Sequence, residues 1–447
     1  MKKQLLATVT LCALLGSSVS HAATTIMEKD DWKVQMYGFI EADAVNDSTR
    51  SFTEVIGNAP VSRPGTYNGD NGRTMFSARN SRLGFILLPP VQDDWKSKGV
   101  FEFDFLGYEP SVGSGVSESA FYQNPTLRIR HAYFATEKDN LQLLAGQTWN
   151  LFGWQPTFMP AILSVAPEAG ELYQRNLQFM ALKTMTFGES NKLQAGVSME
   201  RPSQRDSQMP NFNVGVKYSL DSFRSGYIST SGDDKTEALS IGVSGAFKQF
   251  TTPASTAMTT QQSHYNSSAV AVDILVPIIP SSDGKDTGNT LTLTGEFASG
   301  TGFADTLPNW NGGLTAFPPT AAAGNVGDKT NLDAGQAGFD ANGNFTLVKL
   351  QTWNAALQYH FWSESRMYAN LGYAEVSSSN IGDLTSYASG GASGGYDKSS
   401  TYFINLMKDV SNQIRVGLEY NKVNTHYFSD KLTATNDRYQ LTALFRF

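Results

Sequence analysis

The chain has 447 residues, a formal net charge of −7 and a single cysteine, and 40% of its residues are hydrophobic. This mildly acidic balance disfavours nucleic acid as a partner, and one cysteine cannot build a disulfide framework. The hydrophobic share is below that of a typical globular chain, so a single large conventional core is not expected.

The segment 1–22 is the first recognisable element, and it has the composition of a secretory signal peptide. Two lysines precede a short apolar run at 5–15, and Ser20 and Ala22 supply the small residues that a signal peptidase requires. We therefore expect cleavage after Ala22 and an exported domain at 23–447; the alternative is a buried N-terminal helix. No later apolar run reaches the length of about 18 residues that a transmembrane helix needs.

Alternation of apolar and polar residues dominates the rest of the chain. In "VFEFDFLG", Phe101 and Phe103 alternate with Glu102 and Asp104, and the same period of two recurs at 126–134, 366–374, 413–421 and 438–447. A soluble β-sandwich also alternates. However, these polar faces carry full charges, and the segments run to roughly 9–16 residues, where strands of globular proteins average about 5–6. An open sheet edge in lipid would leave amides unpaired, so the pattern predicts an all-β, antiparallel transmembrane β-barrel.

Turn signals predict how the strands connect. Tight turns are expected at 137–140, 188–190, 231–235, 362–365 and 411–412, with longer ones near 89–97 and 279–288. Long loops are expected near 46–73, 108–125, 150–171, 201–210, 251–265, 300–345, 378–398 and 425–434. Strict alternation of short and long connections is typical of a barrel with periplasmic turns and extracellular loops. When 211–230 is taken as one irregular strand, the count is 16, an even number as expected for a bacterial barrel.

The region 300–345 is rich in Gly, Ala, Asn and Pro. Such a composition buries too little apolar area for a core of its own, so we expect a long extracellular loop that folds over the barrel mouth.

Several segments resemble a known family. The opening strand "WKVQMYGFIEADAV", then "SARNSRLGF", "LAGQTWNLFG" and the terminal "LTALFRF", are similar to the trimeric outer-membrane porins, and in particular to the DcaP-like family. The likeness covers nearly the whole exported domain, and "RNSRLGF" and "GQTWNLFG" are its most specific parts. Unlike family members with an N-terminal coiled coil, this chain has only the short segment "ATTIMEKDDW" before the first strand, without heptads.

The resemblance implies a 16-stranded barrel in the outer membrane of a Gram-negative bacterium, surrounded by lipids and lipopolysaccharide. It also implies a homotrimer, held here by the barrel walls alone, and passive diffusion of small anionic solutes such as dicarboxylates, without a cofactor. Phe447 resembles the aromatic C-terminus that the barrel-assembly machinery reads.

Arginines on the alternating strands are the main candidates for pore residues. If Leu127 and Ile129 face lipid, Arg128 and Arg130 face the lumen; the opposite placement would cost about 2–4 kcal/mol for each arginine at mid-membrane. Arg82 is predicted to point inward by the same reasoning.

These guanidinium groups would form a positive wall that attracts carboxylates. The alternative is that they only pair with Glu102 and Asp104 on the preceding strand. Both roles are compatible, because charged rings tune a pore while they cross-link its wall.

The predicted third loop, 150–171, would fold inward and narrow the channel, as in related porins. Glu168 and Glu171 near its end would then face the arginines, or they are ordinary solvated acids. Arg175 and Arg79 are weaker candidates, because strict alternation places both with lipid-facing neighbours. The predicted pore residues are therefore Arg128, Arg130, Arg82, Glu102, Asp104, Glu168, Glu171, Arg175 and Arg79.

An enzymatic function has little support in the sequence. The exported domain has four histidines without metal-ligand spacing, and it has neither a G-x-S-x-G nor an H-E-x-x-H motif. One of them, His131, is predicted by parity to point outward, at a subunit interface or at the rim. A weakly selective general porin is the nearest alternative function; a barrel enzyme or an adhesin is the more distant one.

Overall fold

The structure is a computed structural model that describes residues 23–107, 125–164, 168–204, 207–229, 237–253, 262–314, 332–385 and 391–447. The expected signal peptide, the predicted turn 231–235 and most of the predicted loop 108–125 lie outside these residues.

The described residues form one large antiparallel sheet and a two-stranded hairpin. The strands are β1 (Thr24–Lys29), β2 (Trp32–Asp47), β3 (Arg73–Ser77), β4 (Arg82–Leu88), β5 (Lys96–Asp104), β6 (Arg128–Lys138), β7 (Leu141–Trp149), β8 (Arg175–Phe187), β9 (Asn191–Glu200), β10 (Asn211–Arg224), β11 (Ala238–Pro253), β12 (Gln262–Ile279), β13 (Leu291–Thr301), β14 (Ala337–Phe339), β15 (Phe345–Leu347), β16 (Lys349–His360), β17 (Met367–Ser378), β18 (Tyr396–Asp409), β19 (Ile414–Tyr427) and β20 (Leu432–Arg446).

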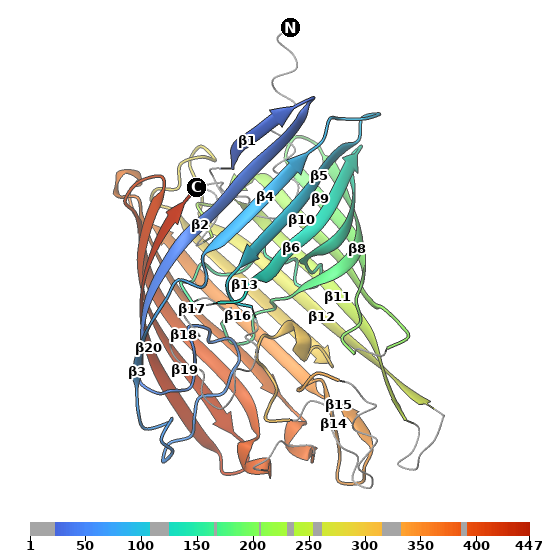
Figure 1. Cartoon of the computed structure of the whole chain (residues 1–447), viewed down its shortest axis with the longest axis vertical. Coiled ribbons are helices and arrows are strands. Elements are labelled where there is room, and N and C mark those ends of the chain that lie inside the picture. The colour runs from blue at the N-terminus through green and yellow to red at the C-terminus, as the bar shows by residue number, and fades with distance from the viewer. Residues whose placement is uncertain are drawn as a thin grey trace.

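The sheet closes into a 16-stranded barrel, as predicted. β20 pairs with β2, and Phe447 and Gly38 complete the seam by exchanging backbone N–H···O bonds of 2.9 and 3.0 Å. β3 and β4 both pair with β2 and count as one barrel strand interrupted at 78–81, while β1 only extends β2 as a hairpin. β1 and the C-terminus lie at the same end of the barrel, the upper one in Figure 1.

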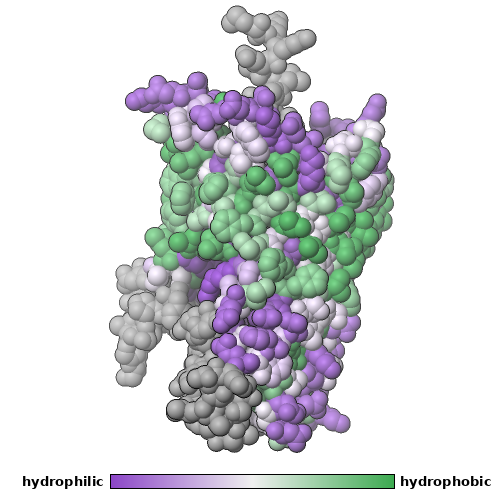
Figure 2. Space-filling model, turned by 90° about the vertical axis from the view of Figure 1, so that its right-hand side faces the viewer, coloured by the Kyte–Doolittle hydropathy of each residue, from purple (hydrophilic) through white to green (hydrophobic). Residues whose placement is uncertain are grey.

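Period-two alternation explains why these segments form the wall. Outward side chains such as Ile40, Phe101, Ile129 and Leu418 are exposed, while their polar neighbours are buried inside. Figure 2 shows the resulting hydrophobic band on one side, with hydrophilic residues above and below it. In the described residues, no helix is long and apolar enough to cross a bilayer.

The prediction of one irregular strand at 211–230 is confirmed in part: β10 is a single strand with a register shift between Leu220 and Arg224, but it ends at Arg224. Strict alternation of short and long connections is wrong, however. Only 428–431 separates β19 from β20, where a long loop was expected at 425–434, and β11 and β12 extend far into the predicted loop 251–265. Alternating sequence continues through both hairpins, so pairing continues beyond the membrane band.

The loop between β13 and β16 is more ordered than its composition indicates. It contains the β14–β15 hairpin, and its Phe303 and Trp310 are buried in an apolar cluster with Ile56 of the β2–β3 loop and Tyr396 of β18. Several loops therefore share one core, and the loop between β13 and β16 contributes to it without a core of its own.

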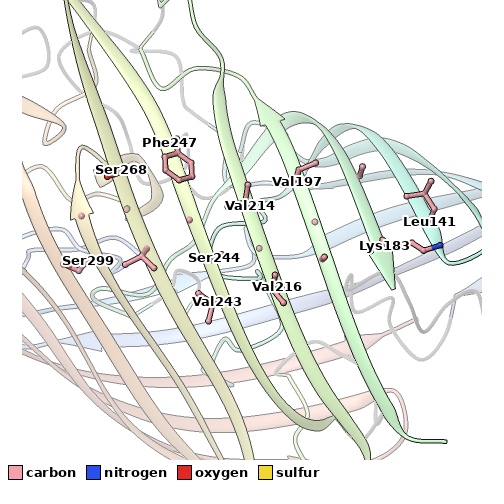
Figure 3. A pocket seen from close by; sticks show the side chains of 18 residues that line it. Leu141, Lys183, Val197, Val214, Val216, Val243, Ser244, Phe247, Ser268 and Ser299 are labelled. Carbon is pink, nitrogen blue, oxygen red and sulfur yellow. The ribbon is translucent and has the colours of Figure 1, made fainter. Parts of the chain in front are cut away.

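An apolar groove of about 810 Å³ lies on the outer wall of the barrel between β7 and β13. Exposed side chains line it, as Figure 3 shows; they include Val197, Val214, Val216, Val243 and Phe247. The alternation that points these side chains outward directs their neighbours, such as Ser198 and Asn213, inward. The groove therefore belongs to the apolar outer surface and not to the lumen.

Candidate pore site

The described residues of the connection from β7 to β8, 150–164 and 168–174, lie inside the barrel, and we call them the inner loop. Near its start, Gly153 N–H donates to Ser244 Oγ of β11 at 2.8 Å. Further along, Leu163 N–H and Ser164 N–H donate to the two carboxylate oxygens of Glu419 on β19, at 2.7 and 3.0 Å. These contacts join the inner loop to two separated parts of the wall.

Small residues on the inner face of the wall make room for the inner loop. A Cβ on Gly215 or Gly242 would lie 3.1 or 2.7 Å from atoms of the Trp154 ring, and a Cβ on Gly417 would lie 2.8 Å from Leu163 Cδ1. Glycine at these strand positions permits close approach of another segment. These glycines line the part of the barrel wall against which the inner loop packs.

The predicted arginines lie on the inner side of β4 and β6 and contact the predicted acids of β5. Arg130 Nε donates to Glu102 Oε1 at 2.6 Å, and its Nη1 donates to Asp104 Oδ2 at 2.9 Å. Arg128 Nη2 donates to the same Asp104 oxygen at 2.6 Å, and Arg82 Nε lies 3.6 Å from Glu102 Oε1. The ion pairs with Glu102 and Asp104 that the sequence suggested are therefore present.

A β-bulge at Arg130 changes the side of the sheet to which the following side chains point. Glu102 pairs with His131, while the next residue, Phe103, pairs with Ile129, so Arg130 is the additional residue in β6. The outward prediction for His131 is wrong for this reason. Its ring is buried inside, with Nδ1 3.0 Å from Thr148 Oγ1 and Nε2 3.8 Å from Glu102 Oε1.

Arg79 and Arg175, which strict alternation places with lipid-facing neighbours, both avoid lipid in different ways. Arg79 lies in the break between β3 and β4, so alternation does not carry across it; its Nη1 donates to Glu54 Oε1 at 3.1 Å. Arg175 is the first residue of β8, and its guanidinium lies 4.6 Å from the Trp149 ring centroid and 5.1 Å from that of Tyr173. Stacking on two aromatic faces is a favourable environment for a partly desolvated cation.

Tyr173 of the inner loop is the pore residue that the sequence reasoning missed. Its hydroxyl accepts a hydrogen bond from Arg175 Nη1 at 3.3 Å. Burial alone would raise the pKa of Tyr173, but the charges of Arg175, Arg130, Arg82 and Arg128 lower it to about 7. We call these four arginines the arginine cluster. Two carboxylates, Glu102 and Asp104, oppose its four cations, which leaves a local formal surplus of two positive charges.

Glu168 and Glu171 do not face the arginine cluster, contrary to expectation. Burial, together with the charges of Glu419 and Glu171, raises the pKa of Glu168 well above its ordinary value. Glu171 accepts a 3.3 Å hydrogen bond from Glu168 N–H, and burial raises its pKa to about 8. Both acids lie against the β13 and β19 side of the barrel, because the adjacent Leu172 N–H donates to Glu296 Oε1 of β13 at 2.8 Å.

In the described part of the chain, no group of three His, Cys, Asp or Glu side chains is arranged to hold a metal ion.

Comparisons with known proteins agree with this architecture. Residues 7–316 match the model of a family described as Gram-negative porin. The chain belongs to the Gram-negative porin family. Its fold is similar to that of the outer membrane channel DcaP of Acinetobacter baumannii, with a TM-score of 0.63 and 17% identity over 95% of this chain and 100% of that one. An anion-selective porin from Comamonas acidovorans gives a TM-score of 0.52 and 10% identity over 93% of this chain and 100% of that one.

No curated protein matches the sequence. At these identities the structural likeness shows the fold alone. The family and fold indicate an outer-membrane channel. We infer that the barrel end near β1 and Phe447 is the periplasmic end, because the short connections 139–140 and 188–190 lie at the same end of the strands.

Proposed function

We propose that this porin passes small anions, such as dicarboxylates, by passive diffusion. The observation that carries this proposal is the surplus positive charge of the arginine cluster on the inner wall of β4, β6 and β8. Guanidinium groups stay charged at physiological pH and bind carboxylates as a fork, and the low-dielectric wall of a narrow lumen strengthens their field.

Within the arginine cluster, Arg128 and Arg175 would attract a solute in the lumen most directly. The Arg128 side chain keeps about a third of its surface accessible (35%), whereas Arg130, held by two acids, keeps 3%. Arg175 stacks on rings and has no carboxylate contact among the described interactions. We infer that the inner loop narrows the lumen opposite these groups.

Further proposals concern the export, assembly and surroundings of the porin. We infer that the signal peptide is cleaved after Ala22, that the porin assembles as a homotrimer, and that Phe447 addresses it to the barrel-assembly machinery. The region 300–345 is inferred to be extracellular, and the barrel is surrounded by outer-membrane lipid and lipopolysaccharide.

The proposal is tested by the reversal potential of the purified porin in a planar bilayer under a salt gradient. Wild-type protein should prefer anions, and Arg128→Glu combined with Arg175→Gln should reduce or reverse that preference. Arg366→Glu, in the periplasmic turn before β17, is the matched control and should leave it unchanged. Cation preference in the wild type, or an unaltered reversal potential in the double variant, would refute the anion proposal but not the channel.

A weakly selective general porin is the second candidate. The pairing of Arg130 with both Glu102 and Asp104 favours it, because neutralised arginines contribute less field. Equal permeation of a neutral sugar and a diacid of similar size into liposomes would support this candidate.

A further inference from the structure

The first part of the connection from β10 to β11, residues 225–229, enters the barrel at its periplasmic end, although β10 and β11 are neighbouring strands. Beyond the register shift at Arg224, residues 225–229 leave the wall, and we call this segment the strap. Two backbone bonds hold its start: Ser225 N–H donates to Glu237 O at 2.6 Å, and Ser281 N–H donates to Arg224 O at 2.9 Å. The strap therefore begins at a defined place on the rim.

The end of the strap is fixed to strands that lie four and seven positions from β10 in the barrel. Ile228 N–H donates to Gln358 Oε1 of β16 at 2.8 Å, and Gln358 Nε2 donates back to Ile228 O at 2.9 Å. Arg415 Nη1 of β19 donates to Ser229 O at 3.1 Å. Between β10 and β19 stand β11, β12, β13, β16, β17 and β18, so the strap crosses the barrel instead of following its wall.

The sequence of the strap suits this path. A Cβ on Gly226 would lie 1.9 Å from Thr290 Oγ1, so only glycine lets the chain pass there. Tyr227 and Ile228 are both buried, and Ile228 packs in an apolar cluster with Leu163 of the inner loop and Tyr368 of β17. An exposed turn would not place two large apolar side chains inside the lumen.

The strap also supports the inner loop. The Tyr227 hydroxyl donates to Met159 O, and the Tyr227 ring packs with Phe158. The described contacts of the strap are with the inner loop and the β10–β19 part of the barrel. They lie away from β4 and β6, which carry Arg82, Arg128 and Arg130.

We propose that the strap is a specificity-determining element that closes the β10–β19 side of the lumen beneath the inner loop. Solute is thereby confined to the side that carries the arginine cluster, because the inner loop and the strap occupy the other side. This inference rests on the proposed anion function for its effect on selectivity, but not for its effect on pore size.

The experiment uses the full-length porin with Tyr227→Ala and Ile228→Ala combined, reconstituted in planar bilayers and in liposomes. Removal of both side chains should open a second path that avoids the arginines. Single-channel conductance should rise roughly twofold, and sugars that the wild type excludes should enter the liposomes. The ratio of anion to cation permeability should fall towards one. Val410→Ala, an exposed apolar residue in the periplasmic turn after β18, is the matched control and should change none of these.

The two proposals fail in different ways. If the wild type shows no anion preference, the proposed function is wrong, and conductance and sugar entry still test the strap. If the folded double variant keeps wild-type conductance and sugar exclusion, the strap inference is wrong whatever the ion selectivity. If that variant does not fold, Gln358→Leu removes the reciprocal anchor and leaves the strap sequence intact; it should raise conductance in the same direction, and unchanged conductance would overturn the inference.

Discussion

Arg438 shows what single residues do in this interior. Its side chain and that of Asp47 are both 0% exposed; Nε and Nη2 donate to the two carboxylate oxygens at 2.8 and 2.7 Å. Arg438 also donates to the carbonyl oxygens of Thr53 and Glu54, so it ties the β2–β3 loop to the barrel wall. An ion pair with all its hydrogen bonds made can be stable when buried, whereas either partner alone cannot.

We therefore expect Arg438→Met to destabilise the porin by about 3–5 kcal/mol, because it leaves Asp47 buried without its cation. Urea unfolding in lipid vesicles, followed by tryptophan fluorescence, measures the change. Arg438→Met combined with Asp47→Leu should recover most of the loss, since no uncompensated charge remains. A single variant as stable as the wild type would show that the pair contributes nothing.

The inner loop shows what an element adds to its residues. Its backbone N–H groups bind Glu419 and Glu296 on separate strands, while its own Glu168 and Glu171 are buried beside them. Four carboxyl groups so placed cannot all be charged at low cost, because burial disfavours the charged form of each and like charges repel one another.

The pH dependence of inner-loop docking follows from Glu171. Burial raises its pKa to about 8, so the docked loop holds this carboxyl protonated. Stability from this group is full below the ordinary carboxyl pKa and is lost as pH rises towards 8. We expect more frequent fluctuations of single-channel current at pH 9 than at pH 6.

Glu171→Gln should remove this pH dependence, and Glu364→Gln, in an exposed periplasmic turn, should retain it. Tyr173 titrates in the same range, so Tyr173→Phe serves as a second control that should keep the fluctuations. Identical current records at both pH values in the wild type would contradict the prediction.

At the scale of the whole molecule, the outer surface decides where the porin resides. The exposed apolar residues of the strands form the band in Figure 2, and polar residues bound it on both sides. In a membrane barrel the cost of an outward charge depends on its depth in the lipid.

Leu418 and Ile414 of β19 test this embedding, because both are exposed on the outer face and Ile414 begins the strand at the periplasmic rim. Leu418→Arg should cost about 2–4 kcal/mol of unfolding free energy in vesicles, and Ile414→Arg about 0–1 kcal/mol. Equal costs at the two positions would show that the band does not span the lipid as described.

Local pattern was sufficient to predict the closed barrel and the inward direction of Arg82, Arg128 and Arg130, whereas the strand number followed only when 211–230 was taken as one strand. Side chains alternate across any extended strand, and lipid admits only a sheet without edges, so these features follow from the chain itself. The strands β5, β17, β19 and β20 were all visible as alternating runs for this reason.

Tertiary structure alone decided the rest. The bulge at Arg130, which turns His131 inward, depends on the register between β5 and β6. The alternation within one strand does not specify its register with the neighbouring strand. The path of the inner loop towards Glu419 and the passage of the strap across to Gln358 and Arg415 join residues far apart in sequence. Such contacts form only once the closed wall has brought those residues to face one another.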